Sequence, residues 1–111
     1  MNITSEEQII DYVSIESGAN QLLNVAESFK ECSKKLNEAA TICDASALSV
    51  NGKSYQDKIY ELAKQMNSIS IEIATYVSNV ITKASELYNQ QTAEYNNYIA
   101  SLKVQSEGNG A

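Results

Sequence analysis

The sequence predicts an all-α protein, an antiparallel two-helix hairpin that assembles as a four-helix bundle with a second chain. Its 111 residues contain no proline, which favours long uninterrupted helices. Apolar residues recur every three or four positions in two long segments, the signature of amphipathic helices. The strongest break between them is Asn51-Gly52, a turn dipeptide whose residues tolerate positive φ. We therefore expect one hairpin domain over residues 1–105.

The first helix is expected to span residues 5–47. Thr4 to Glu7 fits a capping box, with Thr4 as the N-cap and Glu7 reaching back. Bulky and small residues then alternate at steps of four and three: Ile15, Ala19, Leu22, Ala26, Phe29, Ser33, Leu36, Ala40, Cys43 and Ala47. This spacing predicts an interior seam in which small residues admit a neighbouring backbone and large residues interdigitate.

Two features of this helix bear on its neighbours. Val25, Cys32 and Ala39 form a second row that widens the apolar face, which predicts contact with more than one helix. Gly18 costs about 1 kcal/mol relative to alanine inside a helix. It indicates either a break that separates residues 5–16 or close packing against a partner backbone.

The chain has two cysteines, Cys32 and Cys43. On one helix their sulfur atoms would lie roughly 16 Å apart, too far for a disulfide. We expect both to be small buried residues in the reduced form, and a bridge between two chains is the alternative.

The turn is expected over residues 48–53, and the second helix over residues 54–105. Its main apolar stripe comprises Tyr55, Ile59, Leu62, Met66, Ile69, Ile73, Tyr76, Val80, Ala84, Leu87, Gln91, Tyr95, Tyr98 and Leu102. A second row comprises Tyr60, Ala63, Ala74, Val77, Ile81 and Tyr88. Residues 69–81 are rich in β-branched side chains, but their spacing to Met66 and Ala84 favours helix over strand. Residues 106–111 have the composition of a disordered tail.

A lone hairpin would leave these wide apolar faces in water, which predicts an obligate dimer. The partner is a second copy or another small helical protein. We expect the bundle contacts to come from Leu22, Val25, Phe29, Leu36, Ile59, Leu62, Met66 and Ile69. Tyr88, Tyr95 and Tyr98 lie where aliphatic residues are scarce, which indicates either recognition of a protein partner or an amphipathic core edge.

The composition disfavours several other functions. The net charge of −6 and the absence of arginine disfavour nucleic acid. The absence of histidine removes the usual nucleophile pairs and zinc ligands, so we expect no enzyme activity, cofactor or metal. Glu27 and Glu31 are four residues apart, but the lysines beside them favour a solvated salt-bridged face over a catalytic pair.

The first seven residues lack the basic and apolar regions of a signal peptide. The most apolar run, residues 69–81, is too short to span a bilayer. We therefore expect cytoplasmic synthesis without a cleavable signal peptide, and no membrane insertion. If the chain is exported, we expect an export route that does not require a cleavable signal peptide.

The plan of helix, turn, helix, acidic charge and no signal peptide resembles the WXG (Esx-like) family of type VII secretion proteins. That family carries Trp-x-Gly in the turn, and here Val50-Asn51-Gly52 stands in its place. Tyr55 matches the aromatic residue that often follows the glycine by three positions. Because Val50 replaces the defining tryptophan, the chain resembles a divergent member.

The family's export signal, Tyr-x-x-x-Asp/Glu after the second helix, is missing beyond residue 88. Tyr12 and Glu16 have that spacing, but near the other end of the chain. The chain is also similar to the small helical partners of LXG toxins, which bind the toxin's helical N-terminal region and help deliver it for export. The resemblance therefore implies a secretion substrate or an accessory protein that uses a partner's signal.

Two alternatives from other classes remain at this point. A structural coiled-coil or scaffold component would use the same apolar faces for open-ended assembly. An immunity protein would instead use its acidic helix face, with Glu27, Glu31 and Glu38, to block a basic toxin site.

Overall fold

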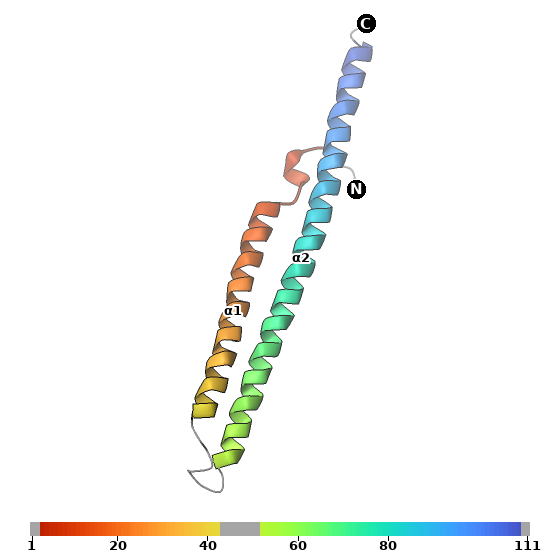
Figure 1. The fold of residues 1–111 in the computed structure, drawn as a ribbon. Coiled ribbons are helices and arrows are strands. Elements are labelled where there is room, and N and C mark those ends of the chain that lie inside the picture. Colours follow the sequence, from red (N-terminus) through yellow and green to blue (C-terminus); the bar gives the residue numbers. More distant parts are fainter. Residues whose placement is uncertain (1–2, 43–51, 110–111) are drawn as a thin grey trace. The chain divides into compact units, whose positions relative to one another are not determined.

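The computed structural model describes residues 3–42 and 52–109 (Figure 1). Its elements are a single 3-10 turn, η1 (Glu6–Gln8), and two long helices, α1 (Tyr12–Ile42) and α2 (Gly52–Asn109). The described residues contain no strand, so the predicted all-α class is confirmed, and residues 69–81 are helical. Most of the predicted turn, with Val50 and Asn51, lies outside the described residues, and so do Cys43 and the last residues of the predicted first helix.

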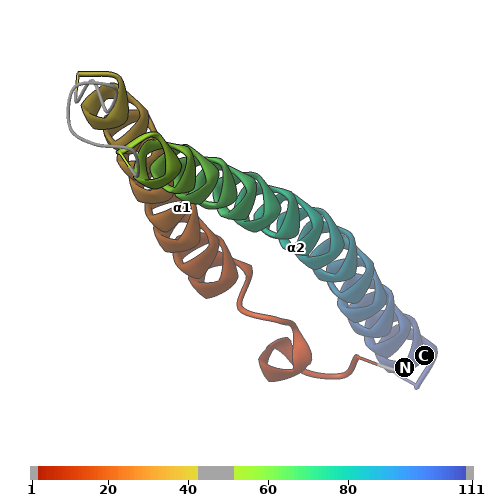
Figure 2. The same ribbon diagram turned by 90° about the horizontal axis from the view of Figure 1, so that it is seen from below.

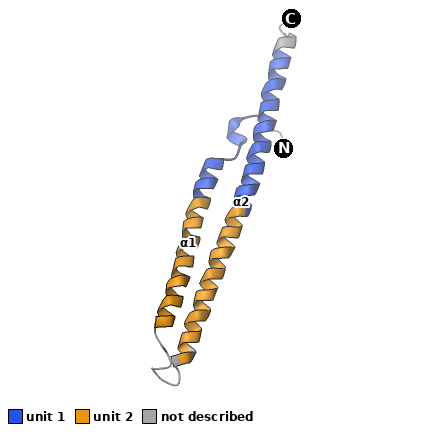
Figure 3. Ribbon diagram, in the orientation of Figure 1, with its two compact units in different colours: residues 1–18, 79–111 blue, residues 19–78 orange. Residues whose placement is uncertain are grey.

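The chain divides into two compact units (Figure 3). Unit 1 combines Met1–Gly18 with Asn79–Ala111, and unit 2 comprises Ala19–Ser78. Each unit therefore contains part of α1 and part of α2.

In unit 2 the two helices lie side by side and run antiparallel (Figures 1 and 2). Two hydrogen bonds show the direction: the Ser33 hydroxyl donates to the Ala63 carbonyl at 2.6 Å, and Gln56 Nε2 donates to the Ala40 carbonyl. The later residue of α1 is thus joined to the earlier residue of α2. The predicted helical hairpin is confirmed.

The interior of unit 2 is a line of small residues at every seventh position. The buried residues are Ala19, Ala26, Ser33 and Ala40 of α1 and Ala63, Ser70 and Val77 of α2. The bond between Ser33 and the Ala63 backbone requires one helix to approach the main chain of the other, which only small side chains permit. A heptad repeat of alanine and serine thus determines how these helices pack, as expected for α1.

The predicted seam is wrong in two respects. The bulky residues of the α1 seam are not interior; Leu22, for example, is 40% exposed. On α2 the predicted main stripe is one residue early at Leu62 and Ile69, which are 45% and 39% exposed. The buried line passes through Ala63 and Val77 of the predicted second row and joins the main stripe at Ala84 and Gln91. Hydropathy weights large side chains most, but the closest helix contact requires the smallest ones.

Gly18 and Cys32 also differ from expectation. Helix α1 continues through Gly18 without a break, and a Cβ added there would meet nothing within 4 Å. The predicted break at Gly18 is therefore wrong, and packing of this glycine against the backbone of a second chain stays a prediction. Cys32 is a free cysteine and is exposed rather than buried, because it lies one residue before the seam residue Ser33 and to the side of the contact.

The N-terminal part of unit 1 is not helical where helix was expected. Residues 9–11 separate η1 from α1, so α1 begins at Tyr12 rather than residue 5. The Asp11 carboxylate starts α1 by accepting hydrogen bonds from the Ser14 amide at 3.0 Å and the Ser14 hydroxyl at 2.7 Å. Figure 2 shows the single turn and the extended stretch that follows it.

The predicted capping box is displaced by one residue. Gln8, not Glu7, reaches back, and its Oε1 accepts hydrogen bonds from the backbone amides of Thr4 at 2.6 Å and Ser5 at 3.0 Å. At the other end α2 continues to Asn109, past the predicted limit of residue 105, because no proline interrupts it. The predicted tail is therefore helical over residues 106–109.

Candidate functional site

The strongest candidate for a functional surface is one side of the unit 2 hairpin. Successive residues of an α-helix are rotated by about 100° around the helix axis. The residue three positions after a seam residue and the residue one position before it therefore lie on the same flank of the seam. When two antiparallel helices are viewed along their axes, the chain of one winds clockwise and the chain of the other winds counterclockwise. The corresponding rows of α1 and α2 therefore fall on the same side of the hairpin.

These rows are apolar on both helices and form what we call the apolar face. It comprises Leu22, Val25, Phe29, Cys32, Leu36 and Ala39 of α1 with Ile59, Leu62, Met66, Ile69, Ile73 and Tyr76 of α2. Val25 and Tyr76 are 44% and 61% exposed, and Phe29 and Met66 are half-buried. A continuous apolar surface of this size usually marks an interface.

All eight residues predicted to form the bundle contacts lie on this face. Leu22, Val25, Ile59, Leu62 and Ile69 are among its exposed members, and Leu36 is half-buried. None of the eight is fully buried by the other helix. The structure therefore brings the predicted bundle residues together and leaves them accessible to a second chain.

The opposite side of unit 2 carries a polar groove. It lies between the helices and is lined by Lys30, Glu31, Ser33, Lys34 and Asn37 of α1 and by Tyr60, Lys64 and Asn67 of α2. At its edge the Tyr60 hydroxyl lies 3.0 Å from Thr41 Oγ1. The exposed side chains of Leu23 and Ile71 also lie on this side, so the polar character belongs to the groove and not to the whole side.

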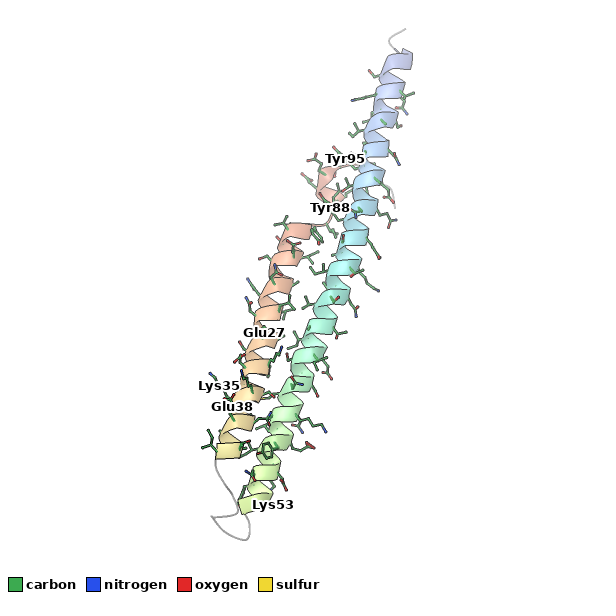
Figure 4. All side chains as sticks on the ribbon, in the orientation of Figure 1. Glu27, Lys35, Glu38, Lys53, Tyr88 and Tyr95 are labelled. Carbon is green, nitrogen blue, oxygen red and sulfur yellow. The ribbon has the colours of Figure 1, made fainter. Side chains whose placement is uncertain are left out.

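The predicted C-terminal tyrosines lie in unit 1, apart from the residues of the apolar face. The Tyr88 ring lies 5.8 Å from the Tyr12 ring, and Tyr98 lines a cavity with Ile3 and Thr4 (Figure 4 shows Tyr88). Burial, and then the charge of Glu16, raise the pKa of Tyr12 above its ordinary value. Tyr95 is half-buried on the same helix.

The N-terminal segment is attached to α2 by contacts that sequence reasoning missed. Ile3 is 2% exposed, and the Ile10 amide donates a hydrogen bond to Gln91 Oε1 at 2.8 Å. Gln91 is itself buried, in agreement with its place in the predicted stripe of the second helix, but nothing in the sequence indicated its bond to Ile10. Two of the three C-terminal tyrosines therefore contact or adjoin residues of the same chain.

Two residues of the predicted turn motif can be placed. Gly52 begins α2, and Tyr55 is 64% exposed with the Lys58 ammonium 5.5 Å from its ring centroid. That distance is within the range of a cation–π interaction. Val50 and Asn51 lie outside the described residues, so the form of the turn is not given.

The predicted acidic residues Glu27, Glu31 and Glu38 are all exposed on α1. Figure 4 shows Lys35 between Glu27 and Glu38 along the helix, so charges of both signs alternate there. Glu38 lines a shallow depression with Asn37, Thr41 and Ile42. Within residues 3–42 and 52–109, no group of three or more His, Cys, Asp or Glu is placed to hold a metal ion. No helix in these ranges is long and apolar enough to cross a membrane.

The fold and the site together define a helical hairpin with an exposed apolar face. Comparison with known proteins adds no narrower class. No family model matches the chain, and no curated protein or solved structure matches it.

Proposed function

We propose that the protein is a non-enzymatic hairpin of type VII secretion that binds a second helical chain through its apolar face. It acts either as a substrate exported with that chain or as an accessory protein that delivers it. The partner is a small helical protein, and the helical N-terminal region of an LXG toxin fits this description. The bound helices complete a four-helix bundle.

The observation that carries this proposal is the apolar face itself. Leu62 and Tyr76 are 45% and 61% exposed, yet they belong to one continuous surface that extends over both helices. Each exposed leucine or isoleucine that a partner covers contributes about 25 cal/mol per Å² of buried apolar area. A helical partner matches the length and the heptad spacing of the surface.

The position of the Tyr12 and Glu16 spacing supports the accessory role. This spacing lies at the start of α1, and the Tyr12 ring packs on Tyr88. In the accessory role the partner chain supplies the export signal for the complex. The resemblance of the turn to that of the WXG family is the reason for proposing type VII secretion as the export pathway.

The test is binding by matched variants of two isoleucines on the same helix. Ile69 on the apolar face is 39% exposed, whereas Ile71 is 59% exposed and lies away from that face. Both positions accept a charge without loss of the hairpin, because neither is interior. We expect Ile69→Glu to abolish the complex and Ile71→Glu to leave it intact.

The complex is measured by co-expression with the helical N-terminal region of an LXG toxin, followed by size exclusion with light scattering. A discrete particle of two or three chains supports the proposal. Open-ended assembly would instead identify a scaffold component. A monomer that ignores the LXG region, or equal loss in both variants, would contradict the proposal.

A further inference from the structure

We propose that the polar groove of unit 2, which is lined with lysines, is a second binding surface that takes an acidic segment of another protein. It is distinct from the apolar face and does not depend on the secretion role. The groove combines Lys30 and Lys34 of α1 with Lys64 of α2.

The charge in this groove is opposite to that of the chain. Its lining holds three lysines and one glutamate, Glu31, a net charge of +2 in a chain whose net charge is −6. No ion pair joins Lys30, Lys34 or Lys64 to another described residue. Three lysines thus line one groove between two helices, and none of them is ion-paired within the described residues of unit 2.

The floor of the groove is fixed by the closest approach of the helices. The Ser33 hydroxyl, bonded to the Ala63 carbonyl, lies in this lining, so the lysines flank a line where the backbones meet. Asn37 and Asn67 add an amide group from each helix, and each amide can both donate and accept. Carboxylates of a bound segment would meet the lysines while its main chain meets these amides.

The shape and residue types favour an acidic peptide over other anions. Lys30 and Asn37 are seven residues apart, about 10 Å along α1, so the groove is elongated rather than a pocket for one phosphate. Lysine provides point charges and no bidentate fork for phosphate. The chain's overall negative charge opposes long polyanions such as nucleic acid.

Because the groove and the apolar face lie on opposite sides of the hairpin, both can be occupied at once. One side would hold a helical partner by apolar contact, and the other would hold an acidic segment by charge. The protein would then connect two chains.

The experiment measures binding of a labelled poly-glutamate peptide by fluorescence anisotropy at low and high salt. One variant reverses the charge of the groove lysines: Lys30→Glu, Lys34→Glu and Lys64→Glu. The control reverses three exposed lysines outside the groove: Lys35→Glu, Lys83→Glu and Lys103→Glu. Both variants have the same net charge, and all positions are exposed.

We expect the groove variant to bind at least about tenfold more weakly than the control, and added salt to weaken the wild type toward the groove variant. Equal loss in both variants would show a bulk charge effect and overturn the proposal. Absence of poly-glutamate binding would also overturn it, as would groove-dependent binding of inorganic phosphate or anionic vesicles at equal or higher affinity. The complex on the apolar face should persist in the groove variant, so the two proposals fail separately.

Discussion

The two units use the same helix α2 in different ways. In unit 2 it meets α1 through small residues, and a side-chain hydroxyl bonds directly to the opposing main chain. In unit 1 its Gln91 side chain bonds the Ile10 amide of the non-helical stretch, and its Tyr88 ring contacts Tyr12 at the start of α1. One heptad line of a helix can therefore make different kinds of contact along its length. Alanine at Ala63 admits a helix, and glutamine at position 91 binds an irregular backbone.

The largest expected effect is in the seam of unit 2. Ala63 is 0% exposed, so Ala63→Leu places a bulky side chain where the helices are closest. We expect a loss of about 3 kcal/mol in the free energy of unfolding. Urea denaturation followed by circular dichroism measures it. Ala74→Leu, at an exposed position of α2, is the matched control and should be nearly neutral; equal losses would show that the seam is loosely packed.

A smaller effect is expected in unit 1 from Gln91→Leu. The change leaves the Ile10 amide without its acceptor, at a cost of about 2 kcal/mol. We expect faster hydrogen exchange at Ile10 and earlier proteolysis of the N-terminal segment. Gln90→Leu alters the exposed neighbour and should do neither. Unchanged exchange at Ile10 would mean that other contacts hold the segment.

The hydroxyl that joins the helices of unit 2 contributes less. Ser33→Ala removes its bond to the Ala63 carbonyl without adding bulk, and we expect a loss of about 1 kcal/mol. Ser28→Ala is the control, because that exposed hydroxyl bonds only within its own helix, to the Asn24 carbonyl. Thermal denaturation compares the two; a larger loss for Ser28→Ala would reverse their ranking.

Gly18→Ala is expected to stabilise the protein. A Cβ at this position of α1 has open space, so the substitution should raise the free energy of unfolding by about 0.8 kcal/mol. Denaturant titration measures this gain. A loss of stability would indicate a close neighbour at Gly18, and weaker assembly without such a loss would place a partner there.

The smallest effect concerns the start of α1. The Ser14 hydroxyl and then the Ser14 amide hold the pKa of Asp11 below its ordinary value of 3.8. A depressed carboxyl pKa stabilises the fold above the unfolded value, and that stabilisation is lost as the pH falls through the folded pKa. An NMR titration should find the Asp11 pKa below 3.8 and closer to 3.8 in Ser14→Ala. An unchanged pKa in that variant would assign the shift elsewhere.

Much of the fold was accessible from the sequence, because periodicity and the absence of proline establish helices without tertiary information. The small residues of the α1 seam, Ala19, Ala26, Ser33 and Ala40, were also identified correctly. The buried line of α2 was not identified correctly over its first half, because the bulky residues beside that line have a higher hydropathy than the small residues within it, such as Ser70. The late start of α1 has a local signal, the Asp11 cap on Ser14, which was overlooked in favour of the pattern at Thr4 to Glu7. The bond of the Ile10 amide to Gln91, far along the chain, has no local signal.

The repeat of small residues has a consequence for alignment. A line of alanines spaced by seven looks nearly the same after a slip of two helical turns, so apolar contact alone would tolerate several alignments. The hydrogen bonds of Ser33 and Gln56 do not remove this equivalence, because both end on main-chain carbonyls that recur at every residue. They hold the helices together in whichever alignment is reached, and the choice among alignments falls to side chains outside the line.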